Sequence, residues 1–372
     1  MRAVLASPRA ECESLRMGQS STDRPAPGAA AIAATLRALS VAYAPTPLLD
    51  LKDLAARLGV AQLLAKDEGR RMLGSFKSLG GTYAGLAALA RARGTDIAGL
   101  VAARADAGDA GLPRLICASD GNHGLAVAAA ARLAGTRALV FLHAGVARVR
   151  ARRIEDEGGE IAWVAGTYDD AVDAAAAFAK ANAGILVADT ASDASDPIVR
   201  DAMAGYGVIA HEVRAQVAAG GHRAPTHLFV QAGVGGLAAA LAEGLRGFLE
   251  APARLVVVEP EQAACLAAAF AQGRVVRIAG ALSTAAEMLS CGEASAPAFA
   301  ILRGAGAQVL TVPERALEEA PQLLRENGGP ATTPSGATGL AGLRSVAGTA
   351  RAADFALTTE SRVLLVISEA AI

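Results

Sequence analysis

The chain has 372 residues, 35 of them basic and 36 acidic, which gives a formal net charge of −1. This length allows two lobes around a large core, and the balanced charge argues against a nucleic-acid-binding protein, which would carry a basic excess. The four cysteines stand far apart without a CxxC spacing, so we expect no metal site, and their small number fits a reducing compartment.

The sequence predicts neither a secretory signal nor a membrane-spanning helix. A four-residue apolar stretch before Pro8 is too short for a signal core, and Arg132 interrupts one of the most apolar segments, residues 125–133. We therefore expect a cytoplasmic protein without membrane contact. Residues 1–30, which become rich in Ser, Pro, Gly and charge toward their end, predict a poorly ordered lead-in.

After this lead-in, short apolar runs alternate with alanine-rich stretches. The predicted strands are residues 138–142, 185–188, 227–231, 255–259 and 363–368. The predicted helices are residues 80–93, 124–134, 168–181, 236–249 and 260–272. This repeated order predicts an α/β fold with mostly parallel sheets and helices on both faces. Active sites in such folds gather at the carboxyl ends of the strands, so we expect the site residues in the turns that follow strands.

The first candidate residue is Lys77, in the run G-S-F-K-S-L-G-G (residues 74–81) at the start of a predicted helix. A lysine in a sheltered, partly apolar site has a lowered pKa and becomes a nucleophile toward carbonyl groups. A solvated surface lysine is the alternative, and for an isolated lysine it is the commoner case.

The second candidate is the loop A-S-D-G-N-H-G (residues 118–124), between an apolar run and a helix. Backbone N–H groups at a helix start, with Ser119 and Asn122 beside them, form a cradle for a carboxylate or a ring oxygen. Ser, Asp and Asn also serve as helix N-caps, and this alternative stays equally open. His123 fits the ordering of this loop better than catalysis.

The third candidate is the glycine-rich turn Q-A-G-V-G-G-L (residues 231–237), directly after a strand and at the start of a helix. Successive N–H groups of such a turn can surround a phosphate at the positive end of the helix. The turn matches neither G-x-G-x-x-G nor a P-loop, so it indicates a phosphate without indicating a nucleotide. A fourth, weaker candidate is Ser368, a hydroxyl at the end of the last strand.

In their order along the chain, these motifs resemble those of the fold type II enzymes that depend on pyridoxal 5'-phosphate (PLP). This family includes serine and threonine dehydratases, threonine synthase and the tryptophan synthase β chain. The resemblance begins at T-P-L (residues 46–48) and covers about nine tenths of the chain. It implies two three-layer αβα lobes with the cofactor in the cleft between them. The large domain would comprise residues 31–80 and 196–372, and the small domain residues 81–195. Family members commonly form homodimers, which we also expect here.

The resemblance also implies roles for individual residues. Lys77 would hold PLP as a Schiff base, Phe76 would pack near the ring, Asn122 would bond its 3'-oxygen, and Ser368 would face its nitrogen. The phosphate would lie in the turn formed by Gly233, Val234, Gly235, Gly236 and Leu237. The substrate carboxylate would lie near Ser119 and Gly121.

Within the family, the chain resembles the diaminopropionate ammonia-lyases in Asp120, the K-D-E run at residues 66–68 and the D-T-A run at residues 189–191. This resemblance implies elimination of ammonia from 2,3-diaminopropionate through aminoacrylate, which water converts to pyruvate. Lys77 and Asp120 would be bases on opposite faces of the substrate Cα. Asp189 would recognise the substrate's distal ammonium.

The chain departs from this pattern around the substrate. S-D-A-S (residues 192–195) replaces an aromatic and acidic stretch, and T-T-P (residues 332–334) stands before Ser335 where many relatives carry a glutamate. A dehydratase of serine or threonine, or another β-eliminating PLP enzyme, therefore stays open, as does a PLP-fold protein that binds a metabolite without catalysis. Cys265 and Cys291 form either a disulfide or two thiols, and a reducing compartment favours thiols.

Overall fold

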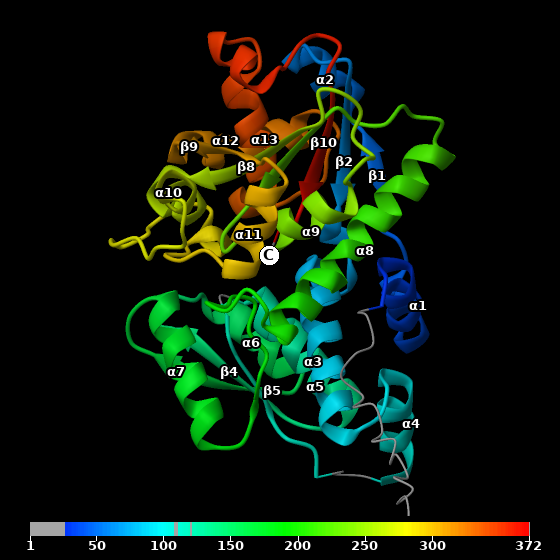
Figure 1. Ribbon diagram of the computed structural model, residues 1–372, viewed down its shortest axis with the longest axis vertical. Helices are drawn as coiled ribbons and strands as arrows, with labels where there is room; N and C mark the ends of the chain where they lie inside the picture. Colours follow the sequence, from blue (N-terminus) through cyan, green and yellow to red (C-terminus); the bar gives the residue numbers. More distant parts are fainter. Residues whose placement is uncertain (1–26, 108–110, 120, 372) are drawn as a thin grey trace, which may run out of the picture.

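The computed structural model describes residues 27–371 apart from 108–110 and 120, and it contains two sheets that belong to two lobes (Figure 1). The strands of the six-stranded sheet are, in spatial order, β1 (Leu48–Asp50), β2 (Gln62–Asp67), β10 (Arg362–Ile367), β7 (His227–Gln231), β8 (Arg254–Pro260) and β9 (Gln308–Val312). The strands of the four-stranded sheet are β5 (Gly159–Val164), β4 (Ala138–His143), β3 (Leu115–Ala118) and β6 (Ile185–Leu186). All neighbouring strands are parallel except β1 and β2. The predicted α/β fold with mostly parallel sheets is confirmed.

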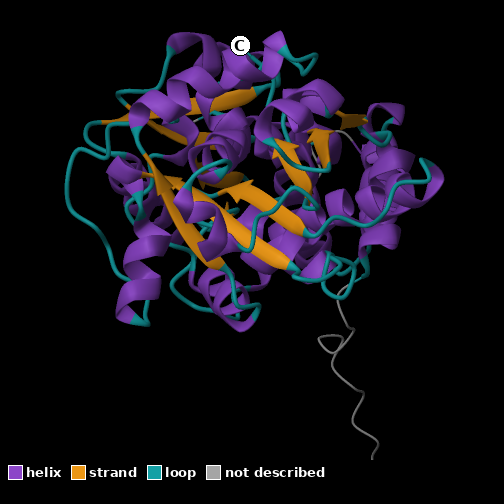
Figure 2. Ribbon diagram, turned by 90° about the horizontal axis from the view of Figure 1, so that it is seen from above, coloured by secondary structure: helices purple, strands orange, loops and turns teal. Residues whose placement is uncertain are grey.

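Helices cover both faces of each sheet (Figure 2). The helices before the small sheet are α1 (Ala29–Leu39), α2 (Lys52–Leu58), α3 (Lys77–Arg93) and α4 (Ile97–Ala107). Those that follow as far as the last strand are α5 (Asn122–Ala134), α6 (Arg148–Asp156), α7 (Tyr168–Ala181), α8 (Pro197–Ala219), α9 (Gly236–Gly244), α10 (Cys265–Gln272), α11 (Ala296–Gly304), α12 (Glu314–Glu326) and α13 (Pro334–Val346). Among the described residues, none of these helices is both long and apolar enough to cross a membrane.

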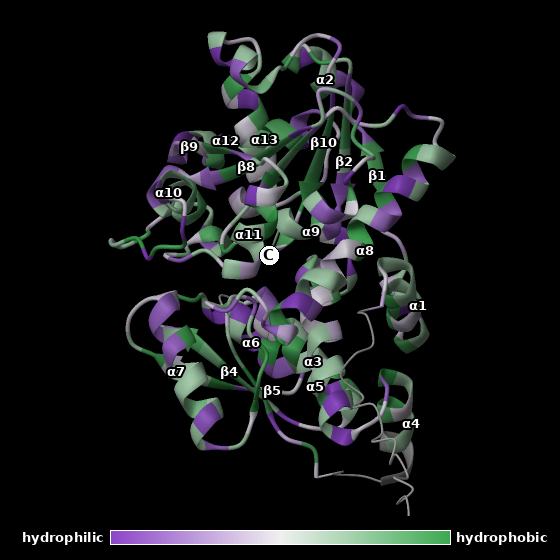
Figure 3. Cartoon of the chain, viewed as in Figure 1, coloured by the Kyte–Doolittle hydropathy of each residue, from purple (hydrophilic) through white to green (hydrophobic). Residues whose placement is uncertain are grey.

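The central strands of the large sheet are apolar on both faces, as expected for a sheet between two helical layers. In β7, Leu228 and Val230 pack into the core formed with α8, α9 and α11, whereas Phe229 packs into the core formed with α2, α12 and α13. Strand β10 alternates in the same way, with Leu364 on the first face and Leu365 on the second. Hydrophobic residues accordingly gather along the strands and the inner helix faces (Figure 3).

The small sheet repeats this arrangement. Leu115 and Cys117 of β3 face α3 and α5, whereas Ile116 and Ala118 face α7. All four strands of this sheet lie between β2 and β7 in the sequence. The domain boundaries at residues 80, 81, 195 and 196 stay a prediction.

The start of α3 is fixed by a very close contact with α8. A Cβ atom at Gly80 would lie 2.2 Å from Cε1 of Tyr206, and one at Gly205 would lie 2.7 Å from Cα of Gly80. Only glycines allow the two backbones to approach this closely. The crossing places Lys77, three residues before Gly80, beside Tyr206 of α8.

Several predicted elements differ from the observed ones. Strands 138–142, 227–231 and 255–259 are found as β4, β7 and β8, but predicted strand 185–188 is reduced to β6. Predicted helix 260–272 is wrong in its first half, because the carboxylate of Glu259 accepts hydrogen bonds from the backbone N–H groups of Leu266 and Ala267 at 2.8 Å and caps a helix that begins at Cys265. Predicted helix 236–249 ends at Gly244. The predicted lead-in lies outside the described residues up to position 26, and its last two residues begin α1.

Candidate active site

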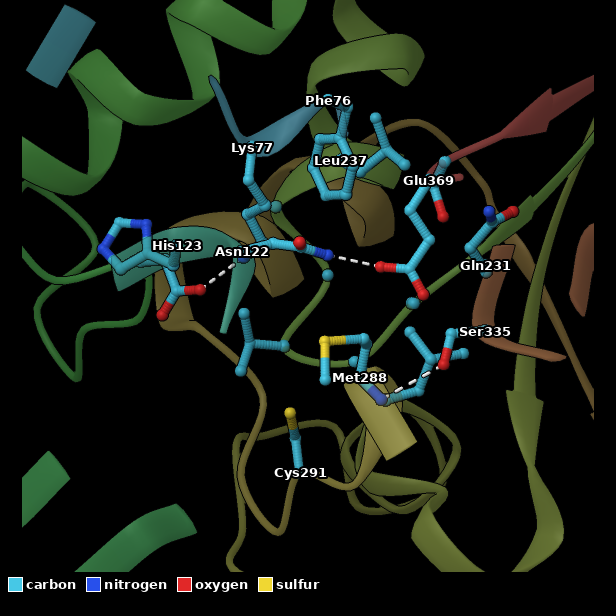
Figure 4. A pocket seen from close by; sticks show the side chains of 18 of the residues that line it. Phe76, Lys77, Asn122, His123, Gln231, Leu237, Met288, Cys291, Ser335 and Glu369 are labelled. Carbon is cyan, nitrogen blue, oxygen red and sulfur yellow. Dashed lines mark hydrogen bonds and ion pairs between the residues drawn. The ribbon is translucent and has the colours of Figure 1, made fainter. Parts of the chain in front are cut away.

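A cavity lies beyond the carboxyl ends of β3, β6, β7 and β10, and the start of α3 also lines it (Figure 4). It brings together most of the predicted site residues, which are Phe76, Lys77, Ser119, Asn122, Asp189, Gly233, Val234, Gly235, Gly236, Leu237 and Ser368. Gly121 is buried but does not line the cavity, and Asp120 lies outside the described residues. The roles of these residues remain predictions.

Lys77 is placed by backbone contacts with the end of the last strand. The N–H of Phe76 donates to the carbonyl of Ser368 at 3.1 Å, and Ser75 pairs with Glu369 in an isolated bridge. Lys77 then begins α3, with its ammonium 5.5 Å from the centre of the Phe76 ring. Residues almost 300 positions apart in the sequence therefore fix the position of Lys77.

The ammonium of Lys77 forms an ion pair with the carboxylate of Asp189, which also accepts a hydrogen bond of 2.9 Å from the hydroxyl of Tyr168. Burial alone would lower the pKa of Lys77, but the Asp189 carboxylate outweighs it and raises that pKa. Burial alone would raise the pKa of Asp189, but the Lys77 cation holds it well below its usual range. The expected low pKa of Lys77 is therefore wrong for the protein without its cofactor, because the fold places beside it a carboxylate from 112 residues further along the chain, which no local sequence pattern indicates.

The loop before α5 uses Ser119 as a cap. Its hydroxyl oxygen accepts hydrogen bonds of 2.8 Å from the backbone N–H groups of Gly121 and Gly124. Gly121 has a φ of 139°, which only glycine adopts readily. The N–H groups of Gly121 and Gly124 are thus occupied within the loop and do not face a substrate carboxylate. The hydroxyl of Ser119 can still donate a hydrogen bond to a ligand.

The glycine-rich turn leads from β7 into α9, and its five predicted phosphate-binding residues all line the cavity. Gly235 has a φ of 99°, in the left-handed region, and no side chain caps the N-terminus of α9. The N–H groups at a helix start carry a partial positive charge and need acceptors. This geometry agrees with the predicted binding of a phosphate, which stays a prediction.

At the end of β10, Ser368 and Glu369 are both buried and line the cavity. The Glu369 carboxylate accepts hydrogen bonds from the amide of Asn122 and the hydroxyl of Thr333. Burial raises the pKa of Glu369, and these two donors oppose that shift. The sequence analysis assigned no role to Glu369. A signal was nevertheless present, because Thr332 and Thr333 stand where many relatives carry a glutamate, and Glu369 supplies a carboxylate beside them.

The contacts of His123 and of the cysteines indicate that these residues have structural roles. The buried His123 ring hydrogen-bonds the carbonyl of Val187 through Nε2 at 2.8 Å, and burial lowers the pKa of this ring. No disulfide joins Cys117, Cys265 and Cys291, the cysteines within the described part of the chain. Cys265 and Cys291 instead pack against Gly233.

The cavity thus combines a lysine, a turn for an anion and an amide donor. Residues 39–369 match the family model of the pyridoxal-phosphate dependent enzymes. Diaminopropionate ammonia-lyase from Escherichia coli strain K12 is 34% identical over 275 residues, which cover 72% of this chain and 68% of the relative. The ammonia-lyase of the same name from Salmonella typhimurium strain LT2 is 36% identical, with 70% of this chain and 67% of the relative covered.

A solved structure gives the same result for the fold. The Escherichia coli diaminopropionate ammonia-lyase in complex with an aminoacrylate-PLP azomethine reaction intermediate superposes with a TM-score of 0.81 at 30% identity, over 92% of this chain and 88% of that chain. The motifs, the two-lobed fold and these similarities lead to one conclusion: the chain belongs to the fold type II enzymes that depend on pyridoxal phosphate.

Proposed function

We propose that this chain is a lyase that eliminates the β-amino group of 2,3-diaminopropionate and releases pyruvate and ammonia. The observation that carries the proposal is Asp189, a partly buried carboxylate that pairs with the Lys77 ammonium inside the cavity and could pair with a substrate ammonium once Lys77 holds the cofactor. A substrate with a second amino group presents such an ammonium, whereas serine and threonine present a hydroxyl. The relatives named diaminopropionate ammonia-lyase support the same substrate.

The described residues fit the cofactor of the family. The uncapped start of α9 and the left-handed Gly235 suit its phosphate. Lys77 is the lysine that would bind the cofactor, because the chain has only three other lysines and none of them lines the cavity. Lys52 and Lys180 are exposed on helices, and the ammonium of Lys66 is held by Glu212, Gln216 and the Thr46 carbonyl at 2.6, 2.9 and 2.7 Å.

Bound PLP supplies an electron sink for the negative charge that develops at the substrate Cα. Lys77, with its amine free, would take the proton from the substrate Cα. Asp189 then stabilises the new ammonium of Lys77 or pairs with the substrate's distal ammonium. Ser119 would donate a hydrogen bond through its hydroxyl to the substrate carboxylate, and Asn122 would orient the cofactor through its amide. Burial between the two lobes keeps these hydrogen bonds away from water.

The direct test is 2-oxoacid release by the PLP-loaded protein with D- and L-2,3-diaminopropionate, serine and threonine in parallel. We expect diaminopropionate to react with the highest kcat/KM. Turnover of serine or threonine alone would reject the proposed substrate and place the chain among the dehydratases. A protein that takes up PLP but transforms none of the four would support the binding function without catalysis.

The Asp120 hypothesis makes a separate prediction, from sequence alone. If Lys77 and Asp120 remove the α-proton from opposite faces, Asp120→Ala will reduce kcat for one enantiomer of diaminopropionate about 10²-fold or more and will leave the other within about threefold. Coupled pyruvate assays with each pure enantiomer measure this. Equal retention of both activities would remove Asp120 from the mechanism.

A substitution in the glycine-rich turn at residues 231–237 can separate backbone strain from the loss of cofactor binding. Gly235→Ala places a Cβ atom at a φ of 99° and 3.2 Å from Ala298 Cβ, so we expect the Kd for PLP to rise at least about tenfold. Gly247→Ala is the matched control, because Gly247 also has a positive φ of 67° but a Cβ atom there has no neighbour within 4 Å. Titration of the apoproteins with PLP compares the two; equal losses would indicate strain alone.

We also propose that the enzyme is a cytoplasmic homodimer, as its resemblance to the family implies. Light scattering of the purified holoprotein tests the assembly, and a monomer at micromolar concentration would reject it.

A further inference from the structure

We infer that Glu369 is a positioning residue that selects the orientation of the Asn122 amide toward the cofactor. The inference rests on the proposed binding of PLP in this cavity and goes beyond it, because it gives a role to a carboxylate that the proposed mechanism does not use. Three observations carry it: the burial of Glu369, the fixed backbone around it, and the two donors on its carboxylate.

The backbone at Glu369 is held from both sides. The hydroxyl of Thr332 donates to the Glu369 carbonyl at 2.5 Å, and the next N–H, that of Ala370, donates to the Gly74 carbonyl at 2.9 Å. Ser75 pairs with Glu369 in an isolated bridge. These contacts tie the end of β10 to the turn before Lys77, so the Glu369 side chain starts from a well-fixed point.

The carboxylate itself is occupied at both oxygens. One accepts from the Thr333 hydroxyl and the other from Nδ2 of Asn122, with Glu369 4% and Asn122 8% exposed (Figure 4). Thr333 caps α13 in the large lobe, whereas Asn122 begins α5 in the small lobe. The contact therefore spans the two lobes across the cavity.

A side-chain amide has two faces of opposite character, a carbonyl oxygen and an NH₂ group, and it can be rotated by about 180° at little cost unless a partner chooses between them. A carboxylate accepts hydrogen bonds, so it binds the NH₂ group and repels the oxygen. With one N–H donated to Glu369, the second N–H of Asn122 stays available as a donor. That donor is what an oxygen on the cofactor ring requires.

The substitutions at this position separate geometry from charge. Glu369→Gln can keep both contacts, because its amide oxygen accepts from Asn122 and its NH₂ donates to the Thr333 hydroxyl. Glu369→Ala removes both contacts. Glu250→Gln is the control, because Glu250 pairs with Arg223 and Arg362 near the start of β8, at the opposite end of the sheet.

The experiment measures the Kd of the apoprotein for PLP by absorbance titration in a double-mutant cycle with Asn122→Ala. We expect Glu369→Ala to raise the Kd about tenfold and Glu369→Gln to stay within about threefold of the unsubstituted protein. In the Asn122→Ala background, neither Glu369 substitution should raise the Kd further, since the amide that Glu369 orients is gone. Thermal melting of each apoprotein reports whether it is folded.

Two results would overturn the inference. One is a Glu369→Ala protein that binds PLP as tightly as the unsubstituted protein. The other is a loss that adds fully to that of Asn122→Ala, which would mean that Glu369 acts on its own. If Glu369→Ala does not fold, Glu369→Gln decides, because a Kd that this substitution raises tenfold or more in both backgrounds also overturns the inference. Failure of the unsubstituted protein to bind PLP would instead reject the proposed function.

Discussion

Lys77→Ala will lower kcat for diaminopropionate by about 10⁴-fold, because it removes the group that binds the cofactor covalently and the base that moves the α-proton. The same substitution will abolish the cofactor adduct that borohydride reduction leaves on the protein. Peptide mass spectrometry measures the adduct, and the chain offers only Lys52, Lys66, Lys77 and Lys180 as positions for it.

Lys180→Ala is the control, because Lys180 is exposed on α7 and its loss should change neither activity nor the adduct. An adduct on Lys66 in the Lys77→Ala protein would contradict the assignment. We do not expect such an adduct, because the fully buried Lys66 ammonium is held by the Glu212 carboxylate at 2.6 Å. Burial lowers the pKa of Lys66, and the Glu212 carboxylate opposes this shift.

Asp189→Asn will lower kcat/KM for diaminopropionate by about 10²-fold, because the distal ammonium of the substrate loses its charged partner in the cavity. Serine carries no distal ammonium, so any residual turnover of serine should fall much less. Steady-state kinetics with both substrates test this difference. Equal losses for the two substrates would mean that Asp189 acts through Lys77 alone.

The same substitution will lower the Tm of the cofactor-free protein by roughly 2–5 °C, since the Lys77 ammonium is left without a carboxylate. The pKa of Asp189 is lowered, so its contribution is present above the ordinary value of 3.8 and is lost as the pH falls through the lower folded value. The pKa of Lys77 is raised, so its contribution is present below the ordinary value of 10.5 and is lost as the pH rises through the higher folded value. The Tm difference should therefore be constant between about pH 5 and pH 9 and should shrink outside that window, as calorimetry can measure.

The sequence predicted the repeating local features of the fold well. Buried runs such as residues 227–231 and 138–142 carry enough branched and aromatic side chains to predict strands, and they are observed as β7 and β4. The short β6 could not be predicted correctly, because the chain leaves the sheet after Leu186 and soon reaches Asp189, whose position is fixed by Lys77. Likewise, the late start of α10 depends on the Glu259 carboxylate, a side-chain effect that periodicity does not contain.

For the site, the motifs located the residues but not their partners. Glycine turns and a lysine at a helix start are local signals, so Lys77 and residues 233–237 could be predicted from sequence. The pairs Lys77–Asp189 and Asn122–Glu369 join residues 112 and 247 positions apart, and only the arrangement of the two sheets brings them together. These distant pairs set the charge of the lysine and the orientation of the amide.

The glycine contact between α3 and α8 also limits how this enzyme can be altered by directed evolution. A library that varies Gly80 or Gly205 would consist mostly of inactive members, because any side chain there pushes apart the helices that seat Lys77. Residues 192–195 impose no such limit, since they form an exposed stretch that follows Asp189 by only three residues in the sequence. New substrate specificities should therefore be sought by randomising that stretch while the helix crossing is kept unchanged.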